Sequence, residues 1–579
     1  MASRYREVYE GWKRDPAGFW AEAAKAIDWY SPAESVFDPA AGVYGRWFVG
    51  ASCNTCYNAL DRHVAGGRAD QLALIHDSAI TGTIRKFTYA ELKREVVALA
   101  SVLRHRGIGR GDLEPGRVVA YKPLLDKAVE MSKHKPDACL ILQREQLRCE
   151  MKDNYDFDYA DAVARERAAG ANVDCVPVLA TDPLYIIYTS GTTGQPKGIV
   201  RDNGGHMVAL KWTMDNEFGV KPGEVFWAAS DVGWVVGHSY IVYGPLLHGA
   251  TSVLFEGKPV GTPDAGTYWR VISEHGVVAL FTAPTAFRAI KGQDPRGEFV
   301  PKYDLSKFRT LFLAGERADP ETIKWAEQKL NRPVIDHWWQ TETGSPMTIN
   351  PAGLGLLPVK YGSPGVPMPG YDIRILDDAG HEVPRGTLGN VVVKLPLPPG
   401  CLPTLWNADA RFRQAYLEEF PGFYKTADAG MMDEDGYLYV MARTDDIINV
   451  AGHRLSTGAM EEVLAAHPDV AECAVIGIAD AMKGQVPLGF VVLNAGVSRD
   501  TGAIESEVVG LVRERIGPVA AFKTVVTIKR LPKTRSGKIL RGTMQKIADK
   551  EDWTMPATID DPAILDEITA ALKGRGIGI

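Results

Sequence analysis

The chain has 579 residues, enough for about three to four domain-sized units. Its 65 Lys and Arg against 72 Asp and Glu give a net charge of -7, and 45% of its residues are hydrophobic, as in an ordinary soluble globular protein. The acidic balance argues against nucleic acid or an anionic membrane as the main partner, and the absence of an apolar run near ~18 residues or of an apolar N-terminal signal predicts a cytoplasmic chain without a transmembrane helix.

The first part of the chain predicts helices followed by an α/β pattern. Residues 1–75 combine short helical patterns, such as PAGFWAEAAKAIDW, with loops rich in Gly and Pro. The next stretch predicts a helix that Thr88 caps and Gly107 ends. From residue 183 onward, apolar β-rich runs alternate with helical patterns: PLYIIYTS, GEVFWAAS, ATSVLFEG, VVALFTAP and FRTLFLAG. This alternation is typical of an α/β fold whose mostly parallel strands are buried.

The remainder of the chain has a different pattern. Between residues 370 and 450 short strands alternate with turns, and DAGH and DEDG are hairpin-like turn signals. The C-terminal part predicts a small α+β unit with helices at 456–467 and 504–516, the strands AECAVIGIAD and GFVVLNAG, and a segment rich in Lys and Arg. We expect a domain boundary near residues 443–446, where a strand gives way to a polar turn.

The seven cysteines are scattered, and only Cys53 and Cys56 form a close pair. A zinc site built on this CxxC would need a second pair of ligands at matching spacing, which the sequence does not contain. A redox pair is a second possibility. We expect instead two ordinary thiols on a helix near the N-terminus.

The strongest chemical signal is TSGTTGQPKG at residues 189–198, directly after the apolar run PLYIIY. Its glycines and hydroxyl residues offer backbone N–H groups that can surround phosphate oxygens, and Lys197 adds a cation for developing pyrophosphate charge. It is not a Walker loop, because Pro196 stands where that motif requires Gly. A flexible surface loop is the alternative for a single Gly-rich segment.

TSGTTGQPKG is similar to the phosphate loop of the adenylate-forming superfamily, which includes acyl-CoA synthetases, peptide-synthetase adenylation domains and luciferases. Further resemblances follow in the same order as in that family: WWQTETG at 338–344, YKTADAG at 424–430, ARTDDIINVAGHRLS at 442–456 and LPKTRSGKILR at 531–541. The long WWQTETG and GHRLS forms resemble the short-chain acyl-CoA synthetase branch, and the propionyl-CoA synthetases most.

This resemblance implies an α/β fold of two main parts. An N-terminal helical cap of the acetyl-CoA synthetase type would cover residues 1–75. A large adenylation domain over 76–444 would hold mixed, mostly parallel sheets with flanking helices and a β-barrel-like subdomain. Asp445 would be the hinge to a small mobile α+β domain over 446–579, which rotates between the two half-reactions.

One departure from the family pattern stands near residues 112–114. The family has several tens of additional residues there, with a buried helix, strands and an FGGF-type stretch whose arginines meet the nucleotide end of CoA. Their absence predicts an incomplete sheet and weaker CoA binding, and it leaves open a catalytically impaired, nucleotide-binding form.

The resemblance also implies roles for single residues. Lys538 would stabilise the charge that develops when a carboxylate attacks the α-phosphate, together with Lys197 and Glu342. Glu342 would hold Mg²⁺ beside phosphate oxygens, and Asp428 would bind both ribose hydroxyls. The residues implied for ATP or AMP binding are Thr189, Ser190, Gly191, Thr192, Thr193, Gly194, Lys197, Gly315, Glu316, Arg317, Asp336, His337, Trp338, Gln340, Thr341, Asp428, Arg443 and Arg454. The family usually has Pro where Arg317 stands.

Further residues would bind the other substrates. The acyl pocket is expected at Val235, Val236, Ala314 and Trp339, and the CoA contacts at Ala451, Gly452 and Arg513. The segment 465–470 resembles a family metal loop formed by His467 and the carbonyls of Ala465 and Val470, although a plain helix-ending loop fits equally well.

The resulting prediction is an AMP-forming acid–thiol ligase that converts propionate, ATP and CoA to propionyl-CoA, AMP and pyrophosphate through propionyl-AMP. Its cofactors would be ATP, Mg²⁺ and CoA, with no tightly bound prosthetic group. The alternatives are acetate or 3-hydroxypropionate as substrate, a carrier-loading adenylation module, and a non-catalytic nucleotide-binding protein. Lys538 resembles a lysine that is silenced by acetylation, which would make a lysine acetyltransferase or deacetylase a partner.

Overall fold

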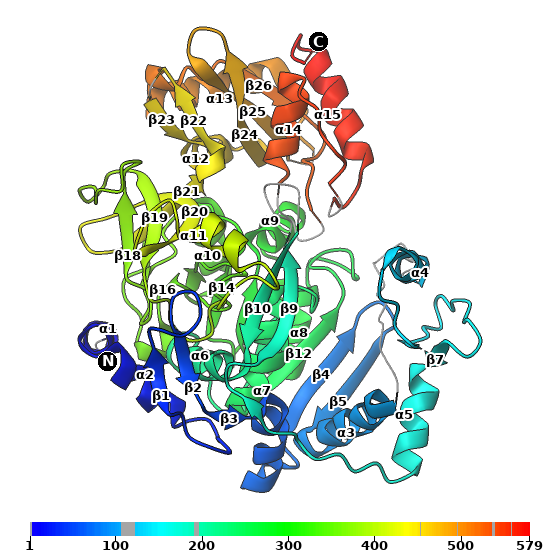
Figure 1. The fold of residues 1–579 in the computed structure, drawn as a ribbon. Helices are drawn as coiled ribbons and strands as arrows, with labels where there is room; N and C mark the ends of the chain where they lie inside the picture. The colour runs from blue at the N-terminus through cyan, green and yellow to red at the C-terminus, as the bar shows by residue number, and fades with distance from the viewer. Residues whose placement is uncertain are drawn as a thin grey trace.

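The structure is a computed structural model that describes residues 3–105, 122–189, 196–451, 453–494, 496–534, 539–556 and 559–578. For residues 104, 105, 445 and 454 it describes the backbone alone. Figure 1 shows a large body that runs from the N-terminus to β21 and a smaller body above it that runs from β22 to the C-terminus. Within the described parts, no helix has the length and apolar character needed to cross a membrane.

A seven-stranded sheet forms the centre of the large body. Its strands, in sheet order, are β15 (Val334–Asp336), β14 (Thr310–Leu313), β13 (Val277–Thr282), β11 (Val225–Ala228), β12 (Thr251–Glu256), β4 (Leu72–Ser78) and β5 (Thr83–Thr88). All neighbouring pairs are parallel except β4 and β5. The predicted parallel α/β arrangement is therefore confirmed for these strands.

Helices bury both faces of this sheet. Successive residues of a strand point to opposite faces, so Leu280 belongs to one hydrophobic cluster and Phe281 to the other, and each is 2% exposed or less. The helices around the sheet are α3 (Tyr89–His105), α6 (Asn203–Asn216), α7 (Gly244–His248), α8 (Thr267–His275), α9 (Pro284–Gln293) and α10 (Pro320–Leu330). The expected cap of α3 is present, because Thr88 and Glu91 exchange two hydrogen bonds of 2.8 and 3.2 Å. Its expected end at Gly107 lies outside the described residues.

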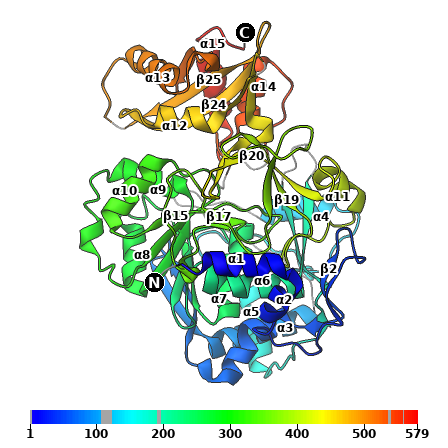
Figure 2. The same cartoon turned by 90° about the vertical axis from the view of Figure 1, so that its left-hand side faces the viewer.

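The N-terminal segment packs on the large body rather than forming a separate core. It contains α1 (Tyr5–Arg14), α2 (Pro16–Ala24), the paired strands β1 (Ser35–Asp38) and β2 (Arg46–Val49), and β3 (Ser52–Cys53). Figure 2 shows α1 and α2 lying across the large body near α6, and the rings of Phe19 and Trp212 are 5.8 Å apart. Tyr5 also donates a 2.8 Å hydrogen bond to the Pro367 carbonyl. The next strand, β4, begins at Leu72 and crosses the boundary expected at residue 75.

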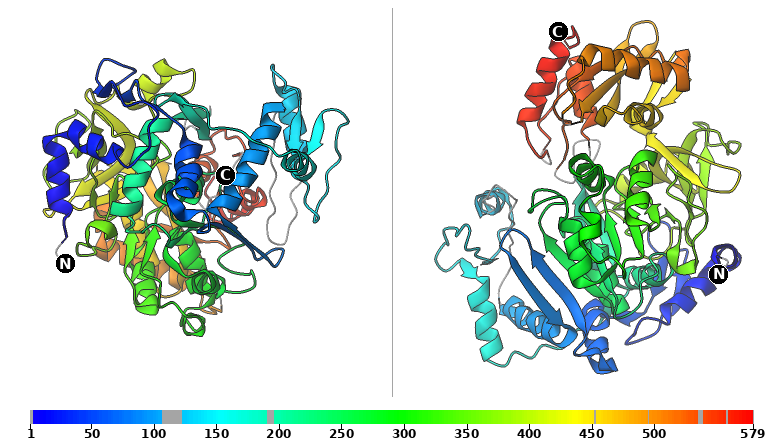
Figure 3. Two further views of the ribbon diagram at one scale, coloured as in Figure 1. Left: turned by 90° about the horizontal axis from the view of Figure 1, so that it is seen from below. Right: turned by 180° about the vertical axis from the view of Figure 1, so that it is seen from behind.

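A small unit projects from the large body beside α3 (Figures 1 and 3). It consists of α4 (Lys122–Met131), β6 (Cys139–Ile141), β7 (Asp156–Asp158) and α5 (Tyr159–Ala168). β6 and β7 pair only with each other among the described strands. Leu140 and Val163 of this unit share a small cluster with Ala98 and Val102 of α3.

Two expectations about single strands were wrong. The run PLYIIY forms β9 (Pro183–Thr189), but it pairs antiparallel with β10 (Lys197–Asp202) in a separate hairpin instead of joining the parallel sheet. The short connection between the two strands favours this direct hairpin over a crossover. Cys53 lies in β3, which pairs with β8 (Val178–Leu179), so Cys53 and Cys56 do not share a helix.

An antiparallel sheet occupies the region expected for the β-barrel-like subdomain. Its strands are β18 (Ile373–Leu376), β19 (Gly389–Lys394), β20 (Phe423–Met432) and β21 (Leu438–Arg443), with β16 (Thr348–Ile349) and β17 (Val366–Pro367) as a separate pair. The predicted turns are present: Gly380 donates to the Asp377 carbonyl at 3.1 Å and Gly436 to the Asp433 carbonyl at 3.0 Å.

The C-terminal body is the predicted α+β unit. Its five strands are β22 (Ile447–Val450), β23 (His453–Ser456), β24 (Val470–Asp480), β25 (Gly484–Leu493) and β26 (Thr524–Thr527), and its helices are α12 (Thr457–Ala465), α13 (Thr501–Arg515), α14 (Arg541–Asp549) and α15 (Ala563–Lys573). α12 and α13 correspond to the two predicted helices, and Ser456 caps α12 by accepting from the Ala459 N–H at 3.1 Å. The short turn over 444–446 joins this body to β21.

Candidate active site

The β9–β10 hairpin holds the two ends of the phosphate-loop motif. Thr189 ends β9, Lys197 begins β10, and the two are direct partners in the hairpin. Five predicted site residues of the loop between them lie outside the described residues: Ser190, Gly191, Thr192, Thr193 and Gly194. The two ends of the motif therefore lie at paired positions of one hairpin.

A tyrosine connects the two charged groups that the motifs predicted. Lys197 Nζ donates to the Tyr416 hydroxyl at 3.2 Å and lies 4.6 Å from the centre of its ring. The same hydroxyl donates to Glu342 Oε1 at 2.7 Å. Burial lowers the pKa of Lys197, and the charge of Glu342 opposes this shift. Tyr416 ends α11 (Asp409–Tyr416), and no motif identified it, because it comes from a segment without a recognised pattern.

A buried arginine fixes the backbone that carries Glu342. Arg201 of β10 is fully buried and donates to the carbonyls of Thr341 and Glu342. Gly344 has a φ of 72°, and a Cβ at this position would lie 2.8 Å from the Arg201 guanidinium carbon. The Ser239 hydroxyl donates to the Gly344 carbonyl at 2.7 Å. Sequence reasoning identified neither Arg201 nor Ser239, because their partners are backbone carbonyls distant in sequence.

Three segments meet around Asp428. Gln340 Nε2 donates to Asp428 Oδ2 at 2.7 Å, and Arg443 Nη1 lies 3.3 Å from Asp428 Oδ1. Tyr424 donates to Gln340 Oε1 at 2.9 Å and thereby orients the amide. Asp428 and Arg443 are also direct partners between β20 and β21. The structure thus brings together the predicted ribose-binding carboxylate, an amide and a guanidinium.

The ends of β14 and β15 position the loop expected to hold adenine. Asp336, the last residue of β15, accepts a long hydrogen bond of 3.4 Å from the Ala318 N–H. Burial raises the pKa of Asp336 to about 8. Gly315 has a φ of 104°, which favours glycine at this turn. The side chain of Asp336 therefore binds the backbone of this loop at Ala318.

His337 points away from this loop. Its ring is 2% exposed and lies 4.6 Å from that of Phe281 and 5.8 Å from that of Phe218. Burial lowers the pKa of His337 to about 3, and no described residue hydrogen-bonds either ring nitrogen. A nucleotide contact at this position would therefore use the backbone. The neighbouring Trp338 is bound through its backbone to Thr348.

Two of the four residues predicted for the acyl pocket lie just after neighbouring strands of the central sheet. Ala314 follows β14 and is 4% exposed, while Trp339 follows β15. The Trp339 ring lies 5.6 Å from that of Tyr240 and 6.1 Å from that of Phe281, so an aromatic wall supports it. The two remaining predicted pocket residues, Val235 and Val236, are buried and half-buried.

The loop after Gly315 also contacts the C-terminal body. Glu316 forms an ion pair with Arg288 of α9. Arg317 instead donates to the Gly458 carbonyl at 2.9 Å and to Glu462 Oε2 at 2.6 Å, both on α12. Its guanidinium is therefore engaged by the second domain, a role that the loop motif did not indicate.

The residues predicted in the C-terminal body are spread over its elements. The Ala451 N–H, after β22, donates to the Lys483 carbonyl at 2.8 Å, and Arg513 is exposed on α13. His467 hydrogen-bonds Glu507 at 3.0 Å and accepts from the Asp469 N–H at 3.2 Å, so both of its ring nitrogens have partners. Gly452, Lys538 and the side chains of Asp445 and Arg454 lie outside what the structure describes.

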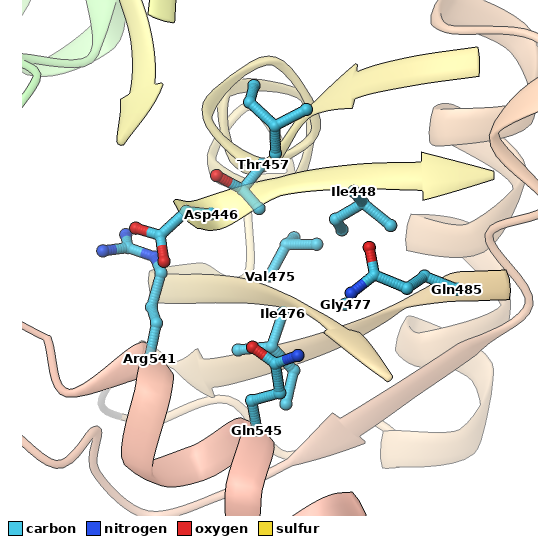
Figure 4. A pocket seen from close by; sticks show the side chains of 10 residues that line it. Asp446, Ile448, Thr457, Val475, Ile476, Gly477, Gln485, Arg541 and Gln545 are labelled. Atoms are coloured by element: carbon cyan, nitrogen blue, oxygen red, sulfur yellow. The ribbon is translucent and has the colours of Figure 1, made fainter. Parts of the chain in front are cut away.

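A small polar pocket lies beside the turn over 444–446. Figure 4 shows the guanidinium of Arg541 next to the carboxylate of Asp446, with Thr457, Gln485 and Gln545 around the same pocket. Its volume is about 10 Å³, which is room for about one water molecule. Arg541 also donates two 3.0 Å hydrogen bonds to Glu461 of α12. The start of α14, shortly after Lys538 in the sequence, thereby contacts α12 and the turn over 444–446.

Three protein-family models match the chain. "AMP-binding enzyme" matches residues 112–398, "AMP-binding enzyme C-terminal domain" matches 459–538, and "Acetyl-coenzyme A synthetase N-terminus" matches 5–59. They follow one another in the order of the predicted domains.

Curated relatives match over almost the whole chain. The mitochondrial acyl-CoA synthetase short-chain family member 3 of Homo sapiens is 46% identical, with 99% of this chain and 91% of that protein covered. A propionate–CoA ligase of Escherichia coli is 39% identical, with 98% of this chain and 100% of that protein covered. An uncharacterized protein of Pseudomonas aeruginosa is 48% identical, with 97% and 98% covered.

The fold also matches a solved structure. Acetoacetyl-CoA synthetase from Streptomyces lividans superposes with a TM-score of 0.83 over 99% of this chain and 98% of that chain, at 20% identity. This likeness shows the adenylate-forming fold. The family models and the curated relatives establish that the chain belongs to the AMP-binding enzyme family, as a short-chain acyl-CoA synthetase that joins an acid to a thiol.

Proposed function

We propose that the acid is propionate and that the chain forms propionyl-CoA in two steps. In the first, the propionate carboxylate attacks the α-phosphorus of ATP, and propionyl-AMP forms as pyrophosphate leaves. In the second, the CoA thiol attacks the acyl carbon, and propionyl-CoA forms as AMP leaves. Acetate and 3-hydroxypropionate are the alternative substrates.

The charged groups of the site support the first step. Lys197 lies at the end of the phosphate loop, where its ammonium would offset charge on the leaving pyrophosphate. Asp428 would accept from the ribose hydroxyls, with Gln340 and Arg443 holding the carboxylate in place. Lys538 would stabilise the attacked phosphoryl group, and its replacement by Ala would abolish acyl-AMP formation but not thioester formation from supplied propionyl-AMP.

Glu342 fits the role of a magnesium ligand. Tyr416 donates to one of its carboxylate oxygens, and no described residue donates to the other, so one hard oxygen ligand is available. Bound there, Mg²⁺ would neutralise phosphate charge. Tyr416 and the Arg201-fixed backbone would orient the carboxylate for this purpose.

The choice of propionate rests on one observation: a small residue, Ala314, and a large one, Trp339, lie at the ends of two neighbouring strands in the predicted acyl pocket. Ala314 follows one strand and Trp339 the next, and the aromatic rings behind Trp339 keep its indole in place. An alanine at this wall leaves room for about one more substrate methylene than a valine would, worth ~0.8 kcal/mol when buried. The indole would exclude long chains. The propionate–CoA ligase of Escherichia coli supports the same choice.

Weaker CoA binding is part of this proposal. The alignment with the human relative spans 629 positions, more than the 579 residues of this chain, so that relative has residues without a counterpart here. If the absent residues include the arginines that meet CoA, Arg513, Ala451 and Gly452 would carry more of its binding. A cytoplasmic location and regulation by acetylation of Lys538 complete the proposal.

The decisive comparison is kcat/KM for acetate, propionate and butyrate in the native protein and in Ala314→Val. We expect propionate to be preferred natively and the propionate-to-acetate ratio to fall in the variant. One methylene gives about 1–3 kcal/mol of discrimination, so acetate should remain a poor substrate. The propionate-to-acetate ratio needs no separate control for stability, because partial unfolding lowers kcat/KM for both acids equally. A native preference for acetate, or an unchanged ratio in the variant, would refute the choice of propionate.

A further inference from the structure

A pair of thiols and a carboxylate converge near the N-terminal segment, in a cluster that shares no residue with the active site. Cys56 precedes the π-helical turn η1 (Tyr57–Asp61), and Asp61 is its last residue. A π-helical turn bonds residues five apart, as the Arg62 N–H bonds the Tyr57 carbonyl here, so Cys56 and Asp61 lie one turn apart on the same side.

Cys175 joins this pair from a distant part of the chain, between α5 and β8. The residue after it, Val176, is held at its backbone by Asn54, whose amide nitrogen donates to the Val176 carbonyl at 2.9 Å. The side-chain oxygen of Asn54 accepts from the Tyr57 N–H at 2.9 Å. One side chain thus links the segment that carries Cys175 to the start of η1.

The three side chains have the spacing of ligands around one ion. The sulfur and carboxylate atoms of Cys56, Asp61 and Cys175 all lie within 4.8 Å of one another, and Cys175 Sγ is 3.6 Å from Asp61 Oδ2. Zinc bonds of about 2.3 Å to sulfur and about 2.0 Å to oxygen in a tetrahedron place those two ligand atoms about 3.5 Å apart. We propose that Cys56, Asp61 and Cys175 bind a thiophilic divalent cation of the zinc class, with water as the fourth ligand.

The charges of the three side chains are compatible with binding a divalent cation. Lys93 of α3 lies 2.6 Å from Asp61 Oδ1, which leaves Oδ2 directed at Cys175. Binding replaces the two thiol protons by one divalent cation, so two metal–sulfur bonds form, two protons leave and the net charge is unchanged.

The site would hold together three parts of the chain: the N-terminal segment, α3 and the connection that leads from α5 to the β9–β10 hairpin. That hairpin carries both ends of the phosphate-loop motif. The cation would therefore restrict the motion of the segment between α5 and β9, which precedes the hairpin. This role is structural and is independent of which acid the enzyme activates.

The test uses the full chain, stripped with a chelator and kept reduced with a phosphine. Co²⁺ is titrated anaerobically while the near-ultraviolet thiolate-to-cobalt charge-transfer absorption is recorded, and Zn²⁺ is then added to displace it. We expect one equivalent of Co²⁺ to bind, with affinity reduced at least about 100-fold in Cys56→Ser and in Cys175→Ser and about 10–100-fold in Asp61→Asn. Cys149→Ser removes a half-buried thiol elsewhere and should leave the titration unchanged.

A second measurement needs no variant. In the native protein, Zn²⁺ should slow the alkylation of Cys56 and Cys175, followed by mass spectrometry, but not that of Cys149. The proposal is overturned if the absorption band persists in both serine variants or if Zn²⁺ protects neither thiol. It is also overturned if the reduced native chain gives no absorption band with Co²⁺. If peroxide then links Cys56 and Cys175 as a disulfide, the two thiols form a redox pair rather than a metal site.

Discussion

Arg317 Nη2 lies 2.6 Å from Glu462 Oε2, and this ion pair joins the loop after β14 to helix α12 of the C-terminal body. The same guanidinium donates to the Gly458 carbonyl, so two contacts converge on one side chain. The preceding residues, Gly315 and Glu316, are those that the motif predicts to meet adenine. The loop predicted to bind the nucleotide is therefore in direct contact with helix α12 of the C-terminal body.

Removing this ion pair should alter the balance between the two half-reactions. Partly exposed pairs contribute about 0.2–1 kcal/mol. Glu462→Gln should therefore change the ratio of ATP–pyrophosphate exchange to thioester formation from supplied propionyl-AMP by about 1.4- to fivefold. The charge exchange Arg317→Glu with Glu462→Arg should restore much of the native ratio. Glu321→Gln breaks an exposed pair within α10 and is the control. Equal effects of Glu462→Gln and Glu321→Gln would contradict the connection.

Tyr416→Phe should impair use of MgATP. The variant keeps the ring beneath Lys197 but loses the hydroxyl that donates to Glu342, a hydrogen bond to a charged group worth about 1.5–3 kcal/mol. We expect kcat/KM for MgATP in pyrophosphate exchange to fall about 10- to 100-fold. Tyr361→Phe removes a similar 2.6 Å hydrogen bond to Glu327 on the surface and should leave exchange unchanged. Equal activity of the two variants would show that Tyr416 does not position Glu342.

Asp336 should make stability fall as pH rises. Its pKa is about 8 in the folded protein and about 3.9 when unfolded, so the folded state binds the extra proton between these values. That contribution is complete below about pH 4 and is lost as pH rises through about 8. Asp336→Asn cannot ionise, so its midpoint of thermal unfolding should rise relative to the native protein between about pH 5 and about pH 9.

The exposed carboxyl of Asp304 provides the control for this experiment. Hydrogen bonding from the Ser306 backbone lowers the pKa of Asp304, so Asp304→Asn should show no such rise. A difference between Asp336→Asn and the native protein that stays constant across the pH range would mean that Asp336 is ionised throughout.

The sequence was most informative where function depends on contiguous residues. Glu342, Asp428 and Lys197 were predicted from motifs, and the structure places Glu342 and Lys197 on a common tyrosine. Tyr416 and Arg201 could not be found this way, because a single tyrosine or arginine in an unremarkable segment gives no pattern and its partners lie far away in sequence. The same is true of Cys175, which lies 119 positions after Cys56 and whose role in the cluster depends entirely on the fold.

Strand patterns were informative within limits. Apolar runs correctly predicted the parallel strands β11 to β14, because burial on both faces demands continuous apolar residues. The same pattern was wrong for β9, which pairs antiparallel with β10, the next strand in the sequence. The contact of Arg317 with α12 depends on how two domains meet, which periodicity within either domain cannot reveal.

Arg513→Ala should raise KM for CoA without affecting pyrophosphate exchange. If Arg513 contacts CoA, its loss removes a charge-assisted contact worth about 1.5–3 kcal/mol. Arg515→Ala, on the same exposed end of α13, is the matched control and should leave KM for CoA unchanged. Initial rates against CoA concentration at saturating ATP and propionate give the comparison. An equal rise in both variants would indicate a general charge effect rather than a contact.

ATP–pyrophosphate exchange in the absence of CoA, with and without propionate, tests most directly whether the chain activates propionate as an acyl-adenylate. Exchange requires reversible formation of the acyl-adenylate, so it isolates the first half-reaction from CoA binding. We expect exchange that depends on propionate and that is slower at equal, subsaturating concentrations of acetate and butyrate. Absence of exchange with every short acid, or faster exchange with acetate than with propionate, would contradict this expectation.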